Sequence, residues 1–336
     1  MLNVFLFLSL IFIVTFLLGR IVEKIRVPWI FASLILGSVF AVFNPFPEIT
    51  GSDIFKFFAS LGMYFLLFII GLEIDLSELK KESSFIVKST FAIILFETLF
   101  GSIVVHYIFG YSWFISCLVA LSFATVGEAV LIPILDEFGI VNTKLGQAII
   151  GIGTLDDVFE VLTLILVAIA IGSGAASDIA LMLFSLLALF MLMIVLTKLG
   201  KKSRKFYFFD IETVFLLTVF ILFLFIGIGK FSEAAPLSSL LAGVALKTFL
   251  PKEKFKLIES EIKAVCYGLF APIFFFWVGS SMNIKYLALY PLLVLLVVAV
   301  SKGSKLIASW LVGRKELGSK QALLMGIGLS VRFSTS

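Results

Sequence analysis

The chain has 336 residues, of which 61% are hydrophobic and 14% charged. An average soluble domain is about 45–50% apolar and about 25% charged, so this composition excludes a soluble enzyme. The formal net charge of +4 comes from basic residues in short loops between apolar segments, which indicates membrane topology and not a nucleic-acid partner. Cys117 and Cys266 lie in apolar segments and His106 is the sole histidine, so we expect neither a disulfide framework nor a Cys/His metal site.

Apolar runs, each about long enough to cross a bilayer as a helix, follow one another along the chain. They predict twelve membrane spans, at 2–19, 28–44, 54–73, 84–109, 112–135, 146–172, 178–199, 209–229, 234–250, 260–282, 286–313 and 321–336. Continuous apolar runs differ from the alternating pattern of an outer-membrane barrel, so we predict an all-α polytopic membrane protein. Charged residues and no small-residue cleavage site follow the first run, which indicates a span and not a signal peptide.

The basic residues alternate between the two sides of these spans. Eighteen of the 26 Lys and Arg residues lie in the first, third and later odd-numbered loops, whereas the even loops and their margins hold Lys56, Lys230 and Lys285. The positive-inside rule therefore places the odd loops in the cytoplasm and the N-terminus outside. We expect the protein to lie in the cytoplasmic (inner) membrane.

The last apolar run stops at Ser336 without a closing basic flank. We expect the chain to be truncated within a helix, so that a further helix and a regulatory C-terminal domain would lie beyond it.

Seven charged residues lie inside predicted spans. Each costs about 2.5–3.5 kcal/mol to insert at a span centre, and such residues by default mark an ion or proton pathway. They are Glu97, Glu128, Asp156, Asp157, Glu160, Lys302 and Lys305.

Asp156 and Asp157 are adjacent, so their side chains point about 100° apart on a helix. One carboxylate can face a partner helix while the other faces a water-filled cavity, which suits an ion site. The alternative is a pair of acids near a helix N-terminus, stabilised by the helix dipole. Glu160 lies one turn later on the same face, where it either widens a cation site or forms a salt bridge within the bundle.

Lys302 and Lys305 lie three residues apart on one face of the run 286–313, and a buried lysine needs a counter-charge. The acids named above are the candidates, and snorkelling from a helix end is the alternative. Glu97 is at least as well explained as a structural partner of Lys302, Lys305 or Arg332 as by direct ion binding. We expect His106 to be an interface residue near an outer helix end.

Two segments carry residues that interrupt helices. The first contains Thr125, Gly127, Glu128 and Pro133, and the second contains Gly326, Gly328, Ser330 and Arg332. Interrupted helices in separate halves of a transporter point to inverted repeats around a site at the membrane midplane. Tight helix packing alone also produces Gly-rich spans, which is the alternative.

Several motifs, spread over nearly the whole chain, resemble the monovalent cation:proton antiporter superfamily. They are Leu18-Gly-Arg20 through Pro28, Phe65-Leu-Leu-Phe-Ile-Ile-Gly71-Leu-Glu73-Ile-Asp75, Asp156-Asp157, Leu241-Ala-Gly243-Val, and Ala271-Pro272 through Gly279. The chain is most similar to the paired-aspartate sodium/proton antiporter type, which is related to the Kef-type exchangers.

The resemblance implies an inverted-repeat antiporter fold of thirteen helices, twelve of them visible, with two crossing broken helices and a core that moves like an elevator. It implies N-terminal scaffold helices in 1–83, the first core repeat in 84–172, linking and dimer-side helices in 173–285, and the truncated second repeat in 286–336. A homodimer in contact with membrane lipid, without a cofactor, is expected.

The resemblance also implies roles for individual residues. Asp157 would bind Na⁺ or a proton, and Asp156 would pair with a lysine, for which the pattern favours Lys305 over its rival Lys302. The remaining candidates are Thr125, Gly127 and Glu128 in the crossing helix, and Glu160, Glu97, Ser330 and Arg332 as auxiliary groups. Glu128 and Glu160 depart from the family pattern, which usually has a neutral residue and Gly there.

The leading hypothesis is therefore secondary antiport of Na⁺, or Li⁺, against H⁺, with a role in pH homeostasis. K⁺/H⁺ exchange is the first alternative, although the resemblance associates potassium efflux with Gln-Asp in place of Asp-Asp. A cation channel is a second alternative, against which the lack of a carbonyl-filter repeat counts. An intramembrane aspartyl protease is disfavoured because its two Asp must share a proton, whereas adjacent Asp on one helix diverge.

Overall fold

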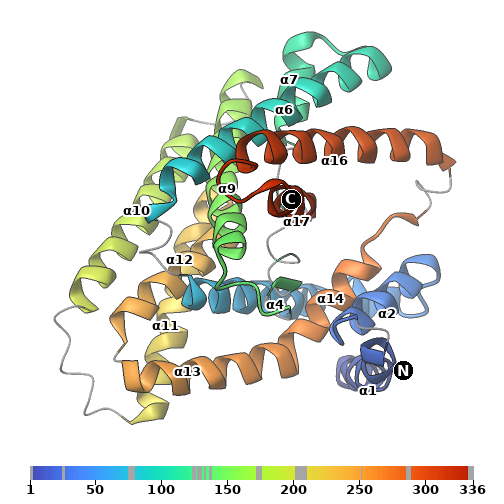
Figure 1. Cartoon of the computed structure of the whole chain (residues 1–336). Helices are drawn as coiled ribbons and strands as arrows, with labels where there is room; N and C mark the ends of the chain where they lie inside the picture. Colours follow the sequence, from blue (N-terminus) through green and yellow to red (C-terminus); the bar gives the residue numbers. More distant parts are fainter. Residues whose placement is uncertain are drawn as a thin grey trace.

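In the computed structural model, the described residues are 3–24, 27–74, 80–122, 126, 131, 134–135, 138–171, 176–200, 210–250, 252–284 and 289–331. This part of the chain is helical throughout and contains no strand, which confirms the all-α prediction (Figure 1). The helices are α1 Val4–Lys24, α2 Phe31–Val42, α3 Pro47–Thr50, α4 Asp53–Glu73, α6 Ser83–Phe109, α7 Trp113–Ser122, α9 Lys144–Ile171, α10 Ala176–Gly200, α11 Ile211–Gly229, η2 Lys230–Ser232, α12 Ala235–Phe249, α13 Lys252–Val265, the π-helix η3 Cys266–Phe270, α14 Ala271–Ser280, α16 Pro291–Gly313 and α17 Ser319–Gly328.

Many of these helices are long and apolar enough to cross a bilayer. Within the described residues seven reach that length and hydropathy, and α2 and α12 are shorter apolar helices. The chain is thus a multi-pass membrane protein, while the count of twelve spans stays a prediction.

Local chemistry explains where several helices begin and end. The Ser52 hydroxyl caps α4 by accepting a hydrogen bond from the Phe55 N–H at 3.3 Å. At the other end of α4, the Lys247 ammonium donates to the Glu73 and Ile74 carbonyl oxygens at 3.0 and 2.9 Å. Gly110 ends α6 with a φ of +72°, a left-handed conformation that glycine adopts without strain.

Among the spans whose ends are described, the predicted start of span 260–282 differs most from the structure. The expected span 260–282 belongs to a helix that begins at Lys252 and continues through η3 into α14. Its first part, α13, is amphipathic: Ile258 and Ile262 are buried, while the polar residues Glu259, Ser260 and Glu261 lie between them. Mean hydropathy misses such a helix because the charged face cancels the apolar face.

The helices pack in two groups (Figure 1). The ion-pair bundle consists of α6, α7, α9, α16 and α17, in which α16 packs on α6 and α17, and α9 packs on α6, α7 and α17. The platform consists of α1 to α4 and α10 to α14, with α4 packed on both α12 and α14. Contacts of α9 with α10 and α12 join the two groups.

Two glycine pairs set the spacing of the platform helices. A Cβ atom on Gly71 in α4 would collide with the Leu240 carbonyl oxygen of α12, and one on Gly243 in α12 would collide with that of Phe68. Gly37 in α2 and Gly279 in α14 form a second reciprocal pair of the same kind. Such small residues let membrane helices approach until their backbones touch. Lipid is as apolar as the side chains, so this close van der Waals packing, and not the hydrophobic effect, holds the helices together.

We predict that Gly71→Ala lowers stability, because the added methyl must push α4 and α12 apart. A cost of about 1–3 kcal/mol is expected from overpacking. The matched control is Gly227→Ala in α11, where a Cβ meets nothing within 4 Å. Thermal unfolding in detergent checks this: a lowered Tm for Gly71→Ala with no loss for Gly227→Ala is expected, and equal Tm values would contradict it.

Candidate functional site

Asp156 lies in the middle of α9 and is buried, with 5% of its surface exposed. Its Oδ2 accepts a hydrogen bond from the Val126 N–H at 2.8 Å. Val126 follows the end of α7 at Ser122 and is itself not helical, so its N–H is available to a group outside its own helix. A non-helical backbone N–H therefore orients this carboxylate.

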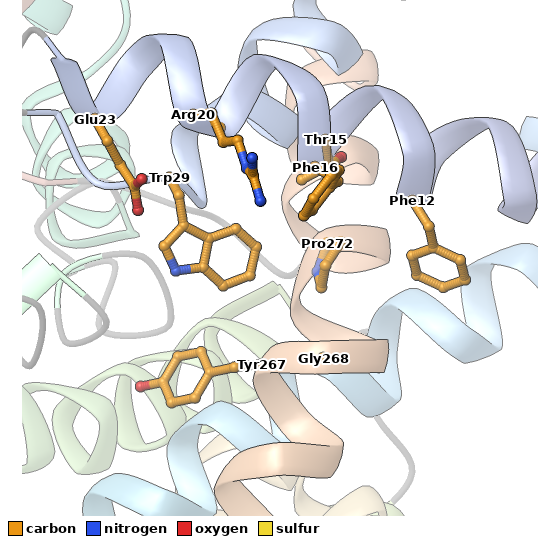
Figure 2. Close-up of a pocket in the computed structure, with 10 residues that line it drawn as sticks. Phe12, Thr15, Phe16, Arg20, Glu23, Trp29, Tyr267, Gly268 and Pro272 are labelled. Atoms are coloured by element: carbon orange, nitrogen blue, oxygen red, sulfur yellow. The ribbon is translucent and has the colours of Figure 1, made fainter.

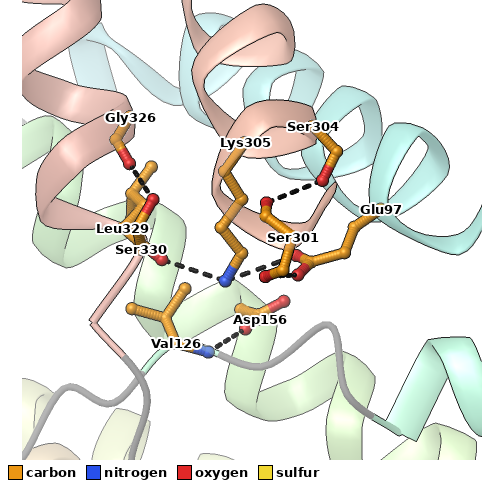
Figure 3. Close-up of polar contacts among 9 residues, drawn as sticks. All are labelled: Glu97, Val126, Asp156, Ser301, Ser304, Lys305, Gly326, Leu329 and Ser330. Atoms are coloured by element: carbon orange, nitrogen blue, oxygen red, sulfur yellow. Dashed lines mark hydrogen bonds and ion pairs between the residues drawn. The ribbon is translucent and has the colours of Figure 1, made fainter. Parts of the chain in front are cut away.

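Lys305 lies on α16 and is completely buried, with an exposed fraction of 0%. Its ammonium donates to the Leu329 carbonyl oxygen at 2.9 Å. Leu329 is the residue at which α17 ends, and the terminal carbonyls of a helix carry partial negative charge, which favours a cation. Asp156 interacts electrostatically with the same ammonium, and Figure 3 shows its carboxylate beside the Lys305 nitrogen.

A second carboxylate meets Lys305 from the opposite helix. Glu97 on α6 is buried, with 3% exposed, and its Oε2 lies 3.4 Å from the Lys305 nitrogen. Its Oε1 accepts a hydrogen bond from the Ser301 hydroxyl at 2.8 Å, and Ser301 lies one turn before Lys305 on α16 (Figure 3). Lys305 thus lies between two acids on different helices, while a serine of its own helix orients one of them.

The other candidates are placed less centrally or are not described. Lys302 is exposed, whereas Asp157 and Glu160 on α9 are half-buried, and Glu160 acts electrostatically on Asp156. The Ser330 hydroxyl donates to the Gly326 carbonyl oxygen at 2.6 Å, within its own segment. The candidates outside the described residues are Thr125, Gly127, Glu128 and Arg332.

Three groups of this cluster are absent from the sequence-based prediction. Two are backbone groups, the Val126 N–H and the Leu329 carbonyl, and the third is the Ser301 hydroxyl. The predicted helix interruptions point to the right segments, because interrupted helices release backbone groups. Nothing in the sequence identifies which residue of each segment supplies the group.

The arrangement is suited to holding charge inside the membrane. The ammonium of Lys305 is compensated by Asp156, Glu97 and a helix terminus, so it does not bear the desolvation cost of an isolated buried charge. Buried acids that face a lysine next to a helix end within the bilayer are typical of ion-coupled secondary transporters.

That class of protein agrees with comparison to known sequences. The family described as "Sodium/hydrogen exchanger, transmembrane" matches residues 10–336. The chain belongs to this sodium/hydrogen exchanger family. This membership confirms the predicted monovalent cation:proton antiporter superfamily. It also supports cation/proton antiport as the general activity of the chain.

Three relatives illustrate the similarity. The "Probable Na(+)/H(+) antiporter 3" of Methanocaldococcus jannaschii is 30% identical over 290 residues, which are 84% of this chain and 71% of that protein. The Na(+)/H(+) antiporter of Enterococcus hirae is 26% identical over 341 residues, covering 97% and 85% of the two chains. The glutathione-regulated potassium-efflux protein KefC of Salmonella paratyphi B is 25% identical over 296 residues, covering 85% and 47%.

A solved structure shares the fold. The sodium proton antiporter MjNhaP1 of Methanocaldococcus jannaschii matches 96% of this chain and 81% of its own, with a TM-score of 0.67 at 19% sequence identity. This match confirms the antiporter fold.

We predict that Lys305→Gln strongly destabilises the protein, since it leaves Asp156 and Glu97 buried without their cation. Breaking a buried ion pair by removing one partner costs about 3–5 kcal/mol. Lys302→Gln is the matched control, because the same substitution three residues earlier affects an exposed side chain. Thermal unfolding of the two variants in detergent should show a lowered Tm for Lys305→Gln alone. A larger loss for Lys302→Gln would mean that the wrong lysine has been assigned.

Proposed function

We propose that this protein exchanges Na⁺, or Li⁺, for H⁺ across the cytoplasmic membrane, with Asp157 as the group that alternately binds the cation and the proton. The observation that carries the proposal is the fixed position of Asp156. Its carboxylate is engaged by Lys305 and by the Val126 N–H, whereas Asp157 points about 100° away on the same helix. The sodium/proton antiporters among the relatives support the choice of Na⁺.

Exchange at one carboxylate has a simple electrostatic rationale. Na⁺ and H⁺ carry the same charge, so replacing one by the other leaves the net charge of the buried cluster unchanged. The protein then never has to carry an extra uncompensated charge through the low-dielectric interior, where such a charge is very costly. Competition for a single site also couples the two ions without a second binding site.

Alternating access requires that this site face each side of the membrane in turn. We propose that the ion-pair bundle moves as one body against the platform, in an elevator motion. The packing supports this division, because the cluster joins α6, α9, α16 and α17 to one another, whereas α9 provides the contacts to α10 and α12. In this proposal the platform also forms the homodimer contact.

Glu97 has a distinct role in this proposal, that of a positioning residue for Lys305. When a cation approaches the aspartate pair, it repels the Lys305 ammonium, which must keep an anionic partner in this buried position. Glu97 at 3.4 Å supplies that partner, and the Leu329 carbonyl at 2.9 Å accepts a hydrogen bond from the same ammonium. Lys305 can then weaken its contact with Asp156 without becoming an isolated charge.

K⁺/H⁺ exchange is the second candidate, and the similarity to KefC is the observation that favours it. Proteoliposomes with an internal pH dye, supplied with Na⁺, Li⁺ and K⁺ in turn, distinguish the two. Proton flux that responds to K⁺ and not to Na⁺ would replace the sodium proposal.

We predict that Asp157→Asn abolishes cation-driven proton flux in the same proteoliposomes, because an amide binds neither the proton nor the cation as a carboxylate does. The protein should remain folded, with a Tm near that of the wild type. Asp210→Asn, which changes an exposed residue before α11, is the matched control and should leave the flux unchanged. Flux near the wild-type rate in Asp157→Asn would refute the assignment.

For Glu97→Gln we predict a raised apparent KM for Na⁺ with kcat nearly unchanged. Without the second carboxylate, Lys305 remains on Asp156 and opposes the entering cation more strongly. About a tenfold rise is expected, which corresponds to about 1.4 kcal/mol.

The control for this variant is Glu82→Gln, which removes a carboxylate from the more exposed ion pair with Lys144 and should change neither constant. A purely structural role of Glu97 would instead lower kcat or the folded yield at constant KM.

A further inference from the structure

A cavity of about 420 Å³ lies on the platform, and no helix of the ion-pair bundle contributes to the lining described for it (Figure 2). It opens between α1 and the helix formed by η3 and α14, next to Trp29. Its volume is within the range of about 300–1,000 Å³ that is usual for small-molecule sites. Nothing in the proposed exchange reaction uses it.

The cavity is polar at one end. Arg20 and Glu23, both exposed residues in the last turns of α1, line this end and point toward Trp29 in Figure 2. The Arg20 guanidinium lies over the Phe16 ring, 4.6 Å from its centroid. This contact holds the guanidinium in place. Its N–H groups lie in the guanidinium plane and remain able to donate hydrogen bonds. One positive and one negative side chain thus lie at the same mouth.

The rest of the cavity is mostly apolar and aromatic, with Thr15 as a polar residue in its lining. Phe12 and Phe16 on α1 and Pro272 on α14 line this part, and Figure 2 shows Trp29 and Tyr267 beside the charged end. Aromatic side chains of this kind are enriched at the level of lipid headgroups. Along α1 the lining therefore passes from Phe12 and Phe16 to Arg20 and Glu23, which matches the order of acyl chain and headgroup in a phospholipid.

The π-helix forms part of the cavity wall. Tyr267 and Gly268, both within η3, line its wall, and a Cβ on Gly268 would meet nothing within 4 Å. Single π-helical turns often occur at functional sites. A larger side chain at position 268 would therefore occupy the cavity without colliding with the backbone, which provides a direct test.

We propose that this cavity binds a phospholipid with a zwitterionic, primary-amine headgroup, such as phosphatidylethanolamine. Arg20 donates to the phosphate, Glu23 accepts from the ammonium, and an acyl chain lies against Phe12 and Phe16. The charges favour this class: a glycerol phosphate headgroup offers hydroxyl groups to Glu23 but no cation. A choline headgroup has no N–H to donate to Glu23.

The experiment is native mass spectrometry of the full chain, purified in detergent and mixed with equal amounts of phosphatidylethanolamine, phosphatidylglycerol or phosphatidylcholine. The wild type should retain phosphatidylethanolamine at least about tenfold more tightly than the other two lipids, a difference of about 1.4 kcal/mol. Gly268→Leu and Arg20→Gln should each lose this preference.

Each variant has a matched control. Gly227→Leu introduces the same side chain at a helical glycine that also has open space around it. Arg314→Gln removes the other arginine that lies over an aromatic ring, at 4.5 Å from the Trp310 centroid. Both controls should bind phosphatidylethanolamine as the wild type does.

Two results would overturn the proposal. Unchanged phosphatidylethanolamine binding in Gly268→Leu would place the lipid elsewhere, and a folded Gly268→Leu, verified by its Tm, makes that result decisive. Equal retention of phosphatidylglycerol or phosphatidylcholine by the wild type would contradict the headgroup assignment. Neither result depends on which cation the protein transports.

Discussion

The burial of one ammonium group, that of Lys305, is the constraint on which the ion-pair bundle depends. An isolated charge inside a membrane protein is so unfavourable that its surroundings must provide compensation. Here Asp156 comes from α9, Glu97 from α6 and a helix-terminal carbonyl from α17. Two pairs of helices from distant parts of the sequence, α6 with α9 and α16 with α17, therefore meet at one nitrogen.

The platform depends on a different interaction. Gly71 with Gly243, and Gly37 with Gly279, bring helix backbones into direct contact without any charge. Close backbone packing suits helices that keep fixed positions relative to one another. Ion pairs, by contrast, can exchange partners when the bundle changes conformation. This contrast supports the proposed division into a moving bundle and a fixed platform, with the cavity at Arg20 belonging to the platform.

Hydropathy predicts most helices well, since α4 and α6 begin and end within one residue of the predicted spans 54–73 and 84–109. It fails at α13, whose charged face hides its buried face. In the site, Asp156, Glu97 and Lys305 are conspicuous because charges are rare in apolar runs. Spacing alone cannot separate Lys305 from Lys302, and it cannot reveal the Val126 N–H or the Leu329 carbonyl, because every residue carries such groups.

Competition between Na⁺ and H⁺ at one carboxylate is the central claim, and the dependence of the apparent KM for Na⁺ on external pH tests it most directly. Proteoliposomes with a fixed internal pH allow the external pH to be varied alone. Protons compete increasingly as the pH falls, so the account predicts that KM rises toward a tenfold change per pH unit while kcat at saturating Na⁺ stays constant. A KM independent of pH, with kcat falling instead, would show two separate sites and contradict the account.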